Sequence, residues 1–490
     1  MNKPIRTIAI FCLLLFLALM ANATYLQYFS SESLNDRAEN RRVFDEAYSR
    51  ERGSIVVGDE PIAESVPSDD QFEYQRVYTQ PFKYAPLTGY FAYQYGASQL
   101  ERTQNDVLTG QDDRLFVTRL VDLLSNQDTQ GGNVVTTIDP AAQNAAYEGL
   151  MSVAGNVEGA VVALEPKTGK ILALASSPTY DPNRLASHDF TEVRDTWDRL
   201  QADESDPMLN RVTQTTLPPG STFKIVTAAA AIENGLYTSA EDLVPGGPTY
   251  QLPLTSGESG LIDNEGRSCG EDKIPFAQAM EQSCNTTFAR LAIEVGAEGM
   301  KEQAEAFGFN NEYLEDLRPQ AVSTYPEKAN EPEVGQTGIG QFNVSSTPLQ
   351  MAMVAAGIAN NGIVMRPYVV DEVQSADLDV VETTQPEDYS EAVSPSTANV
   401  LTELMVSTVD EGTASPAAIP GVQVAGKTGT AQSGIDEVPP YAWFVSFAPA
   451  DDPEVAVAVM IQKADIPRGE IAGGAIGGPI AKAIMEAVIR

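Results

Sequence analysis

The chain has 490 residues, too many for one ordinary hydrophobic core, so we expect two or three domains. Its 31 basic and 68 acidic residues leave a net charge of -37, which argues against a nucleic-acid partner and against adhesion to anionic lipid head groups. The one histidine, His188, stands in a polar segment where we expect a surface loop, so a histidine-based triad and a histidine-rich metal site are both nearly excluded.

The first predicted element is an apolar helix at the N-terminus. Residues 1–6 carry two positive charges, and residues 7–29 carry no charge. At about 1.5 Å per residue this run can cross a bilayer core of about 30 Å, and the flanking positive charges place the N-terminus in the cytoplasm. A cleaved signal peptide is the alternative, because Ala21-Asn22-Ala23 is a small-x-small site. Tyr25, Tyr28 and Phe29 continue the apolar run and favour an uncleaved anchor, and either way the bulk of the chain is extracytoplasmic.

Residues 30–135 have a mixed pattern. A charged helix is expected over residues 33–50, followed by a turn and a strand over residues 52–58. Over residues 72–95 aromatic side chains alternate with polar ones, as they do in half-buried strands. This part contains no set of residues suited to catalysis, so we expect a non-catalytic pedestal domain.

After residue 133 the sequence becomes that of a compact enzyme domain. Asp139-Pro140 predicts a helix start, with a capping side chain and a proline in the first turn. The apolar runs 159–164 and 171–175 flank a turn and predict a hairpin in a sheet. We therefore divide the chain into a cytoplasmic tail, a transmembrane anchor, a pedestal domain and a catalytic domain, which cover residues 1–6, 7–29, 30–135 and 136–490.

Residues 218–235 combine a nucleophile with a base. Two prolines and a glycine before Ser221 oppose a helix, the alanine-rich run after it favours one, and Gly235 is placed to end it. Ser221 should therefore open a buried helix, with Lys224 on the same face and within hydrogen-bond reach. Burial or a second cation can lower the pKa of a lysine enough for it to accept the serine proton.

The three cysteines allow one disulfide in the soluble part. Cys12 falls in the apolar N-terminal run, which leaves Cys269 and Cys284 as the remaining pair. Two cysteines are too few for a four-ligand zinc site. A disulfide in an oxidising compartment is the interpretation that we favour, and two free thiols are the alternative.

Two later motifs carry polar groups suited to a peptide substrate. Ser283-Cys284-Asn285 offers a hydroxyl and an amide within a predicted helix-entry segment, residues 280–293. Lys427-Thr428-Gly429-Thr430 follows an apolar strand and offers N–H groups, a cation and hydroxyls that suit a carboxylate. The same two sequence patterns occur elsewhere in the chain, as Ser33-Leu34-Asn35 and Lys167-Thr168-Gly169. The first of these lies next to the predicted membrane anchor, and the second is explained by the predicted hairpin turn.

The chain contains three short motifs in a fixed order: Ser221-x-x-Lys224, Ser283-x-Asn285 and Lys427-Thr428-Gly429. This ordered set resembles the active-site motifs of penicillin-binding proteins and serine β-lactamases. Other stretches are similar to class B penicillin-binding proteins, above all to the short actinobacterial PbpA type: residues 52–55, 335–341, 347–352, 411–414, 427–432 and 442–445. The family often has a histidine where this chain has Tyr441, so no role is carried over to that position.

The resemblance implies an α+β fold of the penicillin-binding and serine β-lactamase-like kind. In that fold an antiparallel sheet is flanked by helices, with an all-α subdomain beside it. A mixed non-catalytic domain and a single transmembrane helix precede it in class B proteins.

The resemblance also implies a D,D-transpeptidase that cross-links peptidoglycan and is acylated by β-lactams. Ser221 would attack the penultimate D-Ala of a stem peptide after Lys224 takes its proton. Ser283 would relay a proton to the leaving amine, and Asn285 would hold the substrate backbone. An amine of a second stem would then resolve the acyl-enzyme.

The binding residues are carried over from the same resemblance. Lys427 would add positive potential, and Thr428 and Thr430, on either side of Gly429, would meet the terminal carboxylate. Backbone N–H groups of Ser221 and Thr430 would form the oxyanion hole, where donors contribute several kcal/mol.

The partners implied are stem peptides of the lipid-linked precursor and nascent glycan, β-lactam antibiotics, the cytoplasmic membrane and proteins of a division or elongation complex. No metal, organic cofactor or nucleic acid is implied.

Three alternatives stay open: a serine β-lactamase or antibiotic sensor, a D,D-carboxypeptidase with water as acceptor, and a division-complex scaffold with a vestigial site. The anchor and the long N-terminal segment favour a wall synthase, and the intact motif set speaks against a scaffold.

Overall fold

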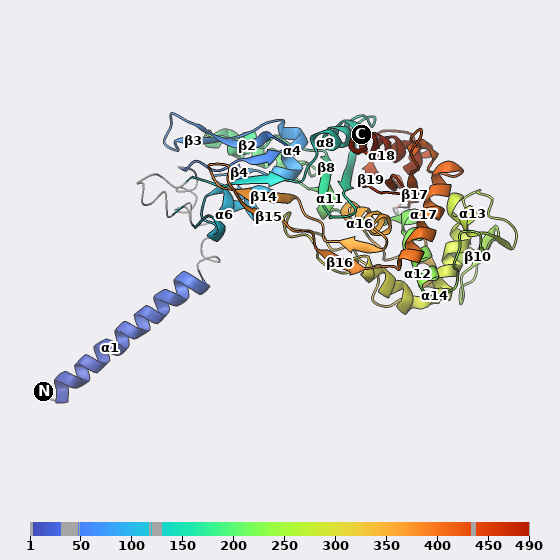
Figure 1. Ribbon diagram of the computed structural model, residues 1–490, viewed down its shortest axis with the longest axis horizontal. Helices are drawn as coiled ribbons and strands as arrows, with labels where there is room; N and C mark the ends of the chain where they lie inside the picture. Colours follow the sequence, from blue (N-terminus) through green and yellow to red (C-terminus); the bar gives the residue numbers. More distant parts are fainter. Residues whose placement is uncertain are drawn as a thin grey trace.

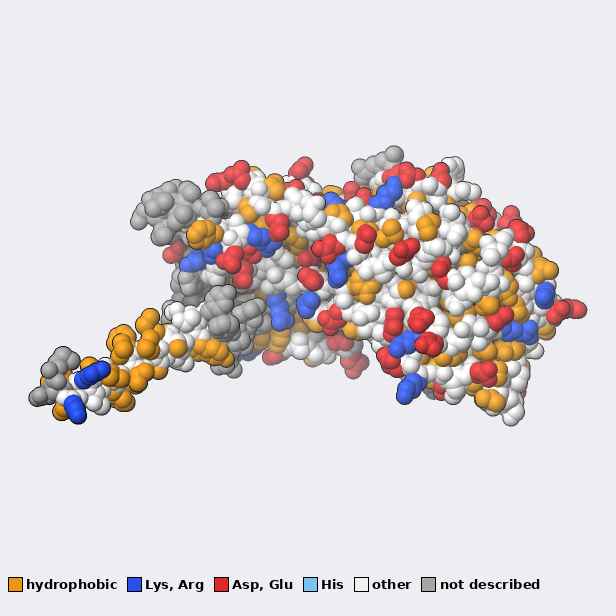
Figure 2. Space-filling model, turned by 60° about the horizontal axis from the view of Figure 1, so that its bottom comes forward, with side chains coloured by type: hydrophobic (Ala, Val, Ile, Leu, Met, Phe, Trp, Pro, Cys, Tyr) orange, Lys and Arg blue, Asp and Glu red, His pale blue; other side chains and the backbone are white. Residues whose placement is uncertain are grey.

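The computed structural model describes residues 3–30, 48, 50–116, 119, 130–432 and 438–489. Helix α1 (Lys3–Thr24) and the π-helical turn η1 (Tyr25–Phe29) extend away from the body, and apolar side chains cover α1 (Figures 1 and 2). The segment Lys3–Gln27 is long and apolar enough to cross a membrane and buries none of its surface, so the predicted apolar helix is confirmed. The helix predicted over residues 33–50 lies, except for Tyr48 and Arg50, outside the described residues.

Residues 55–136, most of them in the part predicted as the pedestal, contribute four strands to a six-stranded mixed sheet with the strand order β15-β14-β6-β1-β2-β3. Two of these strands come from residues 370–383, far along the chain, and β14 pairs with β6. Strand β1 pairs in parallel with β6 and antiparallel with β2. The bounds are β1 (Ile55–Val57), β2 (Glu60–Pro67), β3 (Tyr74–Tyr78), β6 (Asn133–Thr136), β14 (Val370–Gln374) and β15 (Val380–Thr383).

The aromatic stretch over residues 72–95 was predicted as strands and is only partly so. Its middle forms helix α4 (Pro81–Thr88), because a proline occupies the first helical turn and Tyr84 and Leu87 find buried positions. A short hairpin follows, made of β4 (Phe91–Ala92) and β5 (Gly96–Ala97).

His188 is more enclosed than a surface-loop residue. Its side chain is 12% exposed, and its Nδ1 contacts the carboxylate of Asp70. Its ring also lies 4.9 Å from that of Phe72, between centroids. The prediction missed this because the contacts join the loop to a segment more than 100 residues earlier in the chain.

A buried ion triad lies at the centre of the pedestal. Arg52 Nε and Arg76 Nε each donate to the carboxylate of Glu101 at 2.7 Å, and all three side chains are at most 2% exposed. The hydroxyl of Tyr78 donates to the same carboxylate at 3.1 Å, and the guanidinium of Arg52 stacks over Phe91. Helix α5 (Gln99–Thr103) carries Glu101, and α6 (Asn105–Leu108) follows it.

The catalytic unit is built on a five-stranded antiparallel sheet with the order β17-β18-β19-β7-β8. The bounds are β7 (Glu158–Leu164), β8 (Ile171–Ser177), β17 (Ala425–Ala431), β18 (Tyr441–Ala448) and β19 (Val455–Lys463). The predicted hairpin is therefore confirmed, and Gly169, with φ 83°, closes its turn. The predicted helix start is confirmed too, because Asp139 Oδ1 accepts from the N–H groups of Ala141 and Ala142.

Both faces of this sheet are covered by helices (Figure 1). Along β7, Val161 and Ala163 face the core beneath α8 (Pro140–Met151) and α18 (Gly473–Val488). Ala160 and Val162 face the opposite core, which includes α16 (Pro348–Ala359). A strand buried on both faces needs apolar side chains at every position, which explains the unbroken apolar run in the sequence.

A largely helical unit packs beside the sheet. Helix α12 (Lys224–Glu233) is its central element, and every residue from Lys224 to Ile232 is buried. Around it lie α13 (Phe276–Glu281), α14 (Asn285–Ala306), α15 (Glu331–Thr337) and α17 (Pro395–Asp410). The predicted fold, an antiparallel sheet flanked by helices with a helical unit beside it, is confirmed.

Shorter elements connect these units. They are α9 (Asn183–Ala186), α10 (Phe190–Ala202), α11 (Arg211–Gln214), β9 (Leu243–Pro245), β10 (Thr249–Gln251), β11 (Leu261–Asp263), β12 (Lys273–Pro275), β13 (Ile363–Met365) and β16 (Asp388–Glu391). Strands β10 and β11 form a hairpin.

Candidate active site

Ser221 lies in a 3-10 turn, η3 (Gly220–Phe223), and α12 begins only at Lys224. The prediction that Ser221 opens the helix is therefore right to within one turn, and Ser221 is half-buried. Gly220 has φ 54°, and its N–H donates to the carbonyl of Gly340 at 3.1 Å. The stretch over residues 335–341 thus supports the backbone just before Ser221.

The Lys224 side chain is fully buried and points at the second motif. Its Nζ donates to Asn285 Oδ1 at 2.6 Å, to the Ser283 carbonyl at 2.8 Å and to Ser283 Oγ at 3.1 Å. Among the described residues no hydrogen bond joins Lys224 to the Ser221 hydroxyl. The predicted hydrogen bond between Ser221 and Lys224 is thus not formed in this structure, because the amine of Lys224 donates to Ser283 and Asn285 instead.

Ser283 occupies a left-handed turn between two helices. The segment predicted as one helix entry is broken, because α13 ends at Glu281 and Ser283 has φ 52° before α14 begins. This turn directs Ser283 Oγ between two amines, at 3.1 Å from Lys224 Nζ and 2.9 Å from Lys427 Nζ. A left-handed non-glycine residue is uncommon and often marks a functional position.

The third motif lies on β17, an edge strand of the sheet, rather than after it. Lys427 is fully buried, and Nζ also donates to the Thr428 carbonyl at 3.0 Å. A Cβ on Gly429 would lie 2.9 Å from the carbonyl oxygen of Pro219 and from Thr222 Cγ2, so only glycine lets the turn of Ser221 pack on β17.

Thr430 is half-buried on the same strand. The second Lys-Thr-Gly pattern, Lys167-Thr168-Gly169, lies in the turn between β7 and β8, outside the cluster of Lys224, Ser283 and Lys427. Thr413 was missed from the sequence although the stretch 411–414 was noted. Its hydroxyl shares a hydrogen bond of 2.8 Å with that of Thr428, and so fixes the Thr428 side chain.

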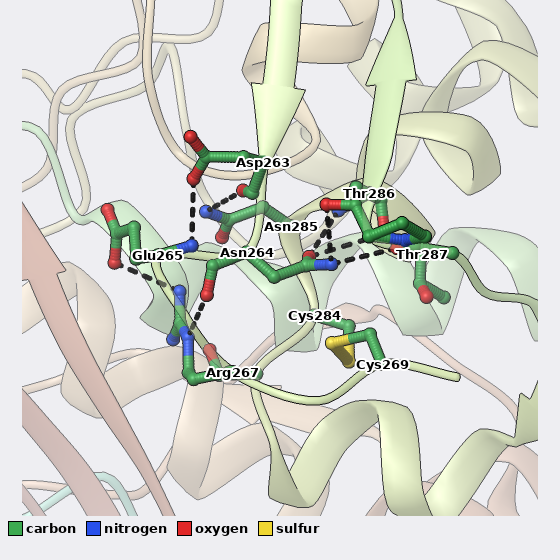
Figure 3. The surroundings of a disulfide bond; sticks show 12 residues. Asp263, Asn264, Glu265, Arg267, Cys269, Cys284, Asn285, Thr286 and Thr287 are labelled. Atoms are coloured by element: carbon green, nitrogen blue, oxygen red, sulfur yellow. Dashed lines mark hydrogen bonds and ion pairs between the residues drawn. A yellow bond between two sulfur atoms is a disulfide. The ribbon is translucent and has the colours of Figure 1, made fainter. Parts of the chain in front are cut away.

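Cys269 and Cys284 form a disulfide, as predicted (Figure 3). Cys284 directly follows Ser283 and caps α14, so the bond attaches residues 263–269 to the second motif. Two side-chain contacts reinforce it. Asn285 Nδ2 donates to the Asp263 carbonyl at 3.0 Å, and Asn264 Oδ1 accepts from the Thr286 N–H at 3.0 Å.

The two lysines are buried cations without a carboxylate partner among the described residues. Burial lowers the pKa of Lys224 well below its usual value, and the charges of Lys427 and Arg267 lower it further. Burial and Arg267 lower the pKa of Lys427 to about 7. A lowered pKa makes the neutral form of a lysine, which can accept a proton, more available near neutral pH.

Arg267 is the second residue that sequence reasoning missed. It belongs to none of the three motifs, and only the disulfide prediction pointed to its neighbourhood. Across the described residues, no group of three or more His, Cys, Asp or Glu side chains could hold a metal ion.

Comparisons with known proteins agree over almost the whole chain. The family described as "Penicillin binding protein transpeptidase domain" matches residues 159–486, and "Penicillin binding protein A dimerisation domain" matches residues 52–134. Peptidoglycan D,D-transpeptidase PbpA of Mycolicibacterium smegmatis is 42% identical over 494 residues, which is 100% of this chain and 99% of that protein. PbpA of Mycobacterium tuberculosis is 42% identical over 496 residues, with the same coverage.

Solved structures are similar as well. The ceftriaxone acyl-enzyme complex of penicillin-binding protein A from M. tuberculosis is 41% identical and covers 91% of this chain and 100% of that chain, with a TM-score of 0.85. Its penicillin G acyl-enzyme complex is 42% identical, with a TM-score of 0.83, and covers 90% of this chain and 100% of that chain.

Proposed function

Since the chain belongs to the class B penicillin-binding proteins of the PbpA type, we propose that it is a peptidoglycan D,D-transpeptidase acting through Ser221. One observation carries the assignment of residues: Ser283 Oγ lies between the amines of Lys224 and Lys427, so three motifs far apart in the sequence meet at one hydroxyl. When no histidine is available, a serine nucleophile needs another base, and an amine that loses its own proton easily can take this role.

In the proposed first step, Ser221 Oγ attacks the carbonyl of the penultimate D-Ala, and Lys224 takes its proton. Because hydrogen bonds in a free enzyme often rearrange when substrate binds, we expect Lys224 to exchange one of its present acceptors for Ser221. Backbone N–H groups of Ser221 and Thr430 stabilise the oxyanion. The turn of Ser221 packs directly on β17, which favours this pairing.

In the second half of the step, Ser283 passes a proton to the leaving amine. Its hydroxyl contacts both buried lysines, so it can receive a proton from either one. The terminal D-Ala leaves, and an amine of a second stem resolves the acyl-enzyme. Asn285 orients the substrate backbone from the position where Lys224 and the Asp263 carbonyl hold it.

Carboxylate binding is assigned to β17. Thr428 and Thr430 offer hydroxyls to the terminal carboxylate, Gly429 lets the chain pack closely behind them, and Lys427 adds positive potential. The hydrogen bond from Thr413 supports this role, because it fixes the position of the Thr428 hydroxyl.

We further propose a single-pass anchor with its N-terminus in the cytoplasm and residues 136–490 as an extracytoplasmic catalytic domain above a pedestal over residues 30–135. The exposed apolar helix α1 supports the anchor, and its flanking lysine and arginine support the orientation. Proteins of a division or elongation complex are the expected partners. N-terminal sequencing of the mature protein tests the anchor, and a chain that starts at Thr24 would contradict it.

Acylation by benzylpenicillin, followed by intact and peptide mass spectrometry, tests the function. We expect a stable adduct on the peptide that contains Ser221 and no adduct on Ser221→Ala. Labelling of Ser221→Ala to the wild-type extent would overturn the assignment of the nucleophile. Rapid loss of the adduct would indicate a β-lactamase instead.

A further inference from the structure

Residues 263–269, which we call the 263–269 loop, are attached to the active site at three points. The disulfide joins its last residue to Cys284, the Asp263 carbonyl accepts from Asn285, and Asn264 accepts from the Thr286 N–H (Figure 3). These contacts all fall on the residues that follow Ser283. The loop is therefore held beside the reacting groups as firmly as the motif itself.

Arg267 is the fixed cation of this loop. Its Nε donates to the Asn264 carbonyl at 2.8 Å, and Nη2 meets the Glu265 carboxylate at 3.0 Å. Nη1 has no hydrogen-bond partner among the described residues. The side chain is 25% exposed and that of Glu265 is 55% exposed, so solvent reaches this ion pair.

The charge of Arg267 reaches into the active site. The loop holds Arg267 beside the residues that follow Ser283, and its positive charge lowers the pKa of both Lys224 and Lys427. Because these amines lose their protons easily and an arginine does not, Arg267 is the cation of this group that stays charged at neutral pH.

We propose that Arg267 binds a second carboxylate of the peptide substrate, on the stem residues that precede the two terminal D-alanines. The inference rests on the proposed function, which assigns the terminal carboxylate to Thr428 and Thr430. A planar guanidinium with free N–H donors binds a carboxylate through two parallel hydrogen bonds. An exposed ion pair such as that with Glu265 contributes little, so an incoming carboxylate can compete for it.

Arg290, on helix α14, offers a matched control because it packs on strand β10 of the neighbouring hairpin. Its guanidinium lies over the ring of Tyr250, 4.6 Å from the centroid, whereas the charges that lower the pKa of the two lysines are those of Lys427 and Arg267. Arg290→Gln therefore removes an arginine from this neighbourhood without removing the cation that faces the site.

The test compares two penicillins that differ by one carboxylate. Benzylpenicillin lacks a carboxylate on its side chain, and carbenicillin carries one at the carbon next to the amide. Second-order acylation rates are measured with both drugs on the full-length protein, for the wild type, Arg267→Gln, Arg267→Lys and Arg290→Gln. Thermal melting of each variant checks its folding.

We expect Arg267→Gln to slow carbenicillin about tenfold more than benzylpenicillin, the size of effect typical for a lost hydrogen bond to a charged group. Arg267→Lys should recover part of this selectivity, and Arg290→Gln should leave the ratio of the two rates unchanged. An equal fall for both drugs, or no fall for either, would overturn the inference. A wild type that neither drug acylates would instead refute the proposed function, and the inference with it.

Discussion

Two groups of buried cations, one in the pedestal and one in the active site, have opposite kinds of partners. In the pedestal, Arg52 and Arg76 are each 2% exposed and share the fully buried carboxylate of Glu101. In the active site, Lys224 and Lys427 are fully buried with hydroxyl, amide and carbonyl oxygens as partners, and no ion pair to a carboxylate is found among the described residues.

The difference follows from the chemistry of the two side chains. A guanidinium does not give up its proton in a protein, and the carboxylate of Glu101 compensates the charge of Arg52 and Arg76. A buried lysine can become neutral instead, and a neutral amine is a base. A paired cation therefore supports the fold, whereas an unpaired lysine supports proton transfer.

The largest expected effect is on catalysis. Lys224→Ala removes the amine that accepts the proton of Ser221, so we expect a folded protein that is acylated by benzylpenicillin about 10²–10⁴-fold more slowly. Stopped-flow or quenched mass spectrometry gives the rate. Lys167→Ala, which changes the lysine of the exposed hairpin turn, should acylate at the wild-type rate.

The pedestal triad should matter for stability and not for chemistry. Glu101→Gln leaves two buried arginines without an anion, and breaking a buried ion pair in this way costs about 3–5 kcal/mol of the free energy of unfolding. Denaturant titration measures it. Glu382→Gln, which removes the exposed partner of Arg114, should cost less than about 1 kcal/mol. Equal costs for the two variants would contradict the comparison.

The disulfide links stability to the active site. Cys269 and Cys284 are 15 residues apart, and closing such a loop contributes about 3 kcal/mol in the chain-entropy account. Cys269→Ser should therefore lower the melting temperature, and should slow acylation because the 263–269 loop positions Asn285 and Arg267. Cys12→Ser, in the apolar helix, should do neither. Two cysteines that alkylate readily in the folded, unreduced protein would contradict the bridge.

The rate of acylation should depend on pH in a defined direction. Lys224 acts as a base only when neutral, so the rate should rise as pH increases through its lowered pKa and then level off. Below that pKa the neutral fraction changes about tenfold per pH unit. A rate that stays flat from acid to strongly alkaline conditions would show that another base is at work.

Local features were predictable from the sequence because they depend on near neighbours. The cap at Asp139, the hairpin turn at Gly169 and the glycine after α12, Gly235 with φ 72°, each follow from residues within one or two turns. The structure also brings residues of the three motifs together, because Lys224 and Lys427 both donate to Ser283.

Contacts between distant segments were not predictable. From the sequence, Glu101 looks like an ordinary helix-surface glutamate, but two arginines from other segments pair with it. Arg267 looks like an ordinary loop cation, but the disulfide attaches its loop to the second motif. The pairing of β14 with β6 joins residues more than 230 positions apart, and no local pattern records it. The left-handed turn at Ser283 likewise depends on what holds both of its ends.

The last expected effect is the pH dependence of folding that Lys427 contributes. Its pKa is about 7 in the folded protein against an ordinary 10.5, so between these values the unfolded chain holds a proton that the folded chain lacks. The free energy of unfolding should therefore rise with pH in this window, by at most about 1.4 kcal/mol per unit, and the slope should vanish below about 7, where both states are protonated. Because the pKa of Lys224 is also lowered in the folded protein, Lys224 likewise makes the free energy of unfolding rise with pH.

Buried tyrosines set the upper limit of the measurement. Burial raises the pKa of Tyr180, so above its ordinary value of 10.0 the unfolded chain loses a proton that the folded chain keeps, and stability falls. Denaturant titrations between pH 7 and 9 therefore isolate the lysines. Lys427→Met keeps the volume of the buried stem but removes the amine, so its stability should rise less steeply over this range. Equal slopes for this variant and the wild type would show that Lys427 stays protonated in the folded protein, and the contrast with the paired arginines of the pedestal would then fail at that residue.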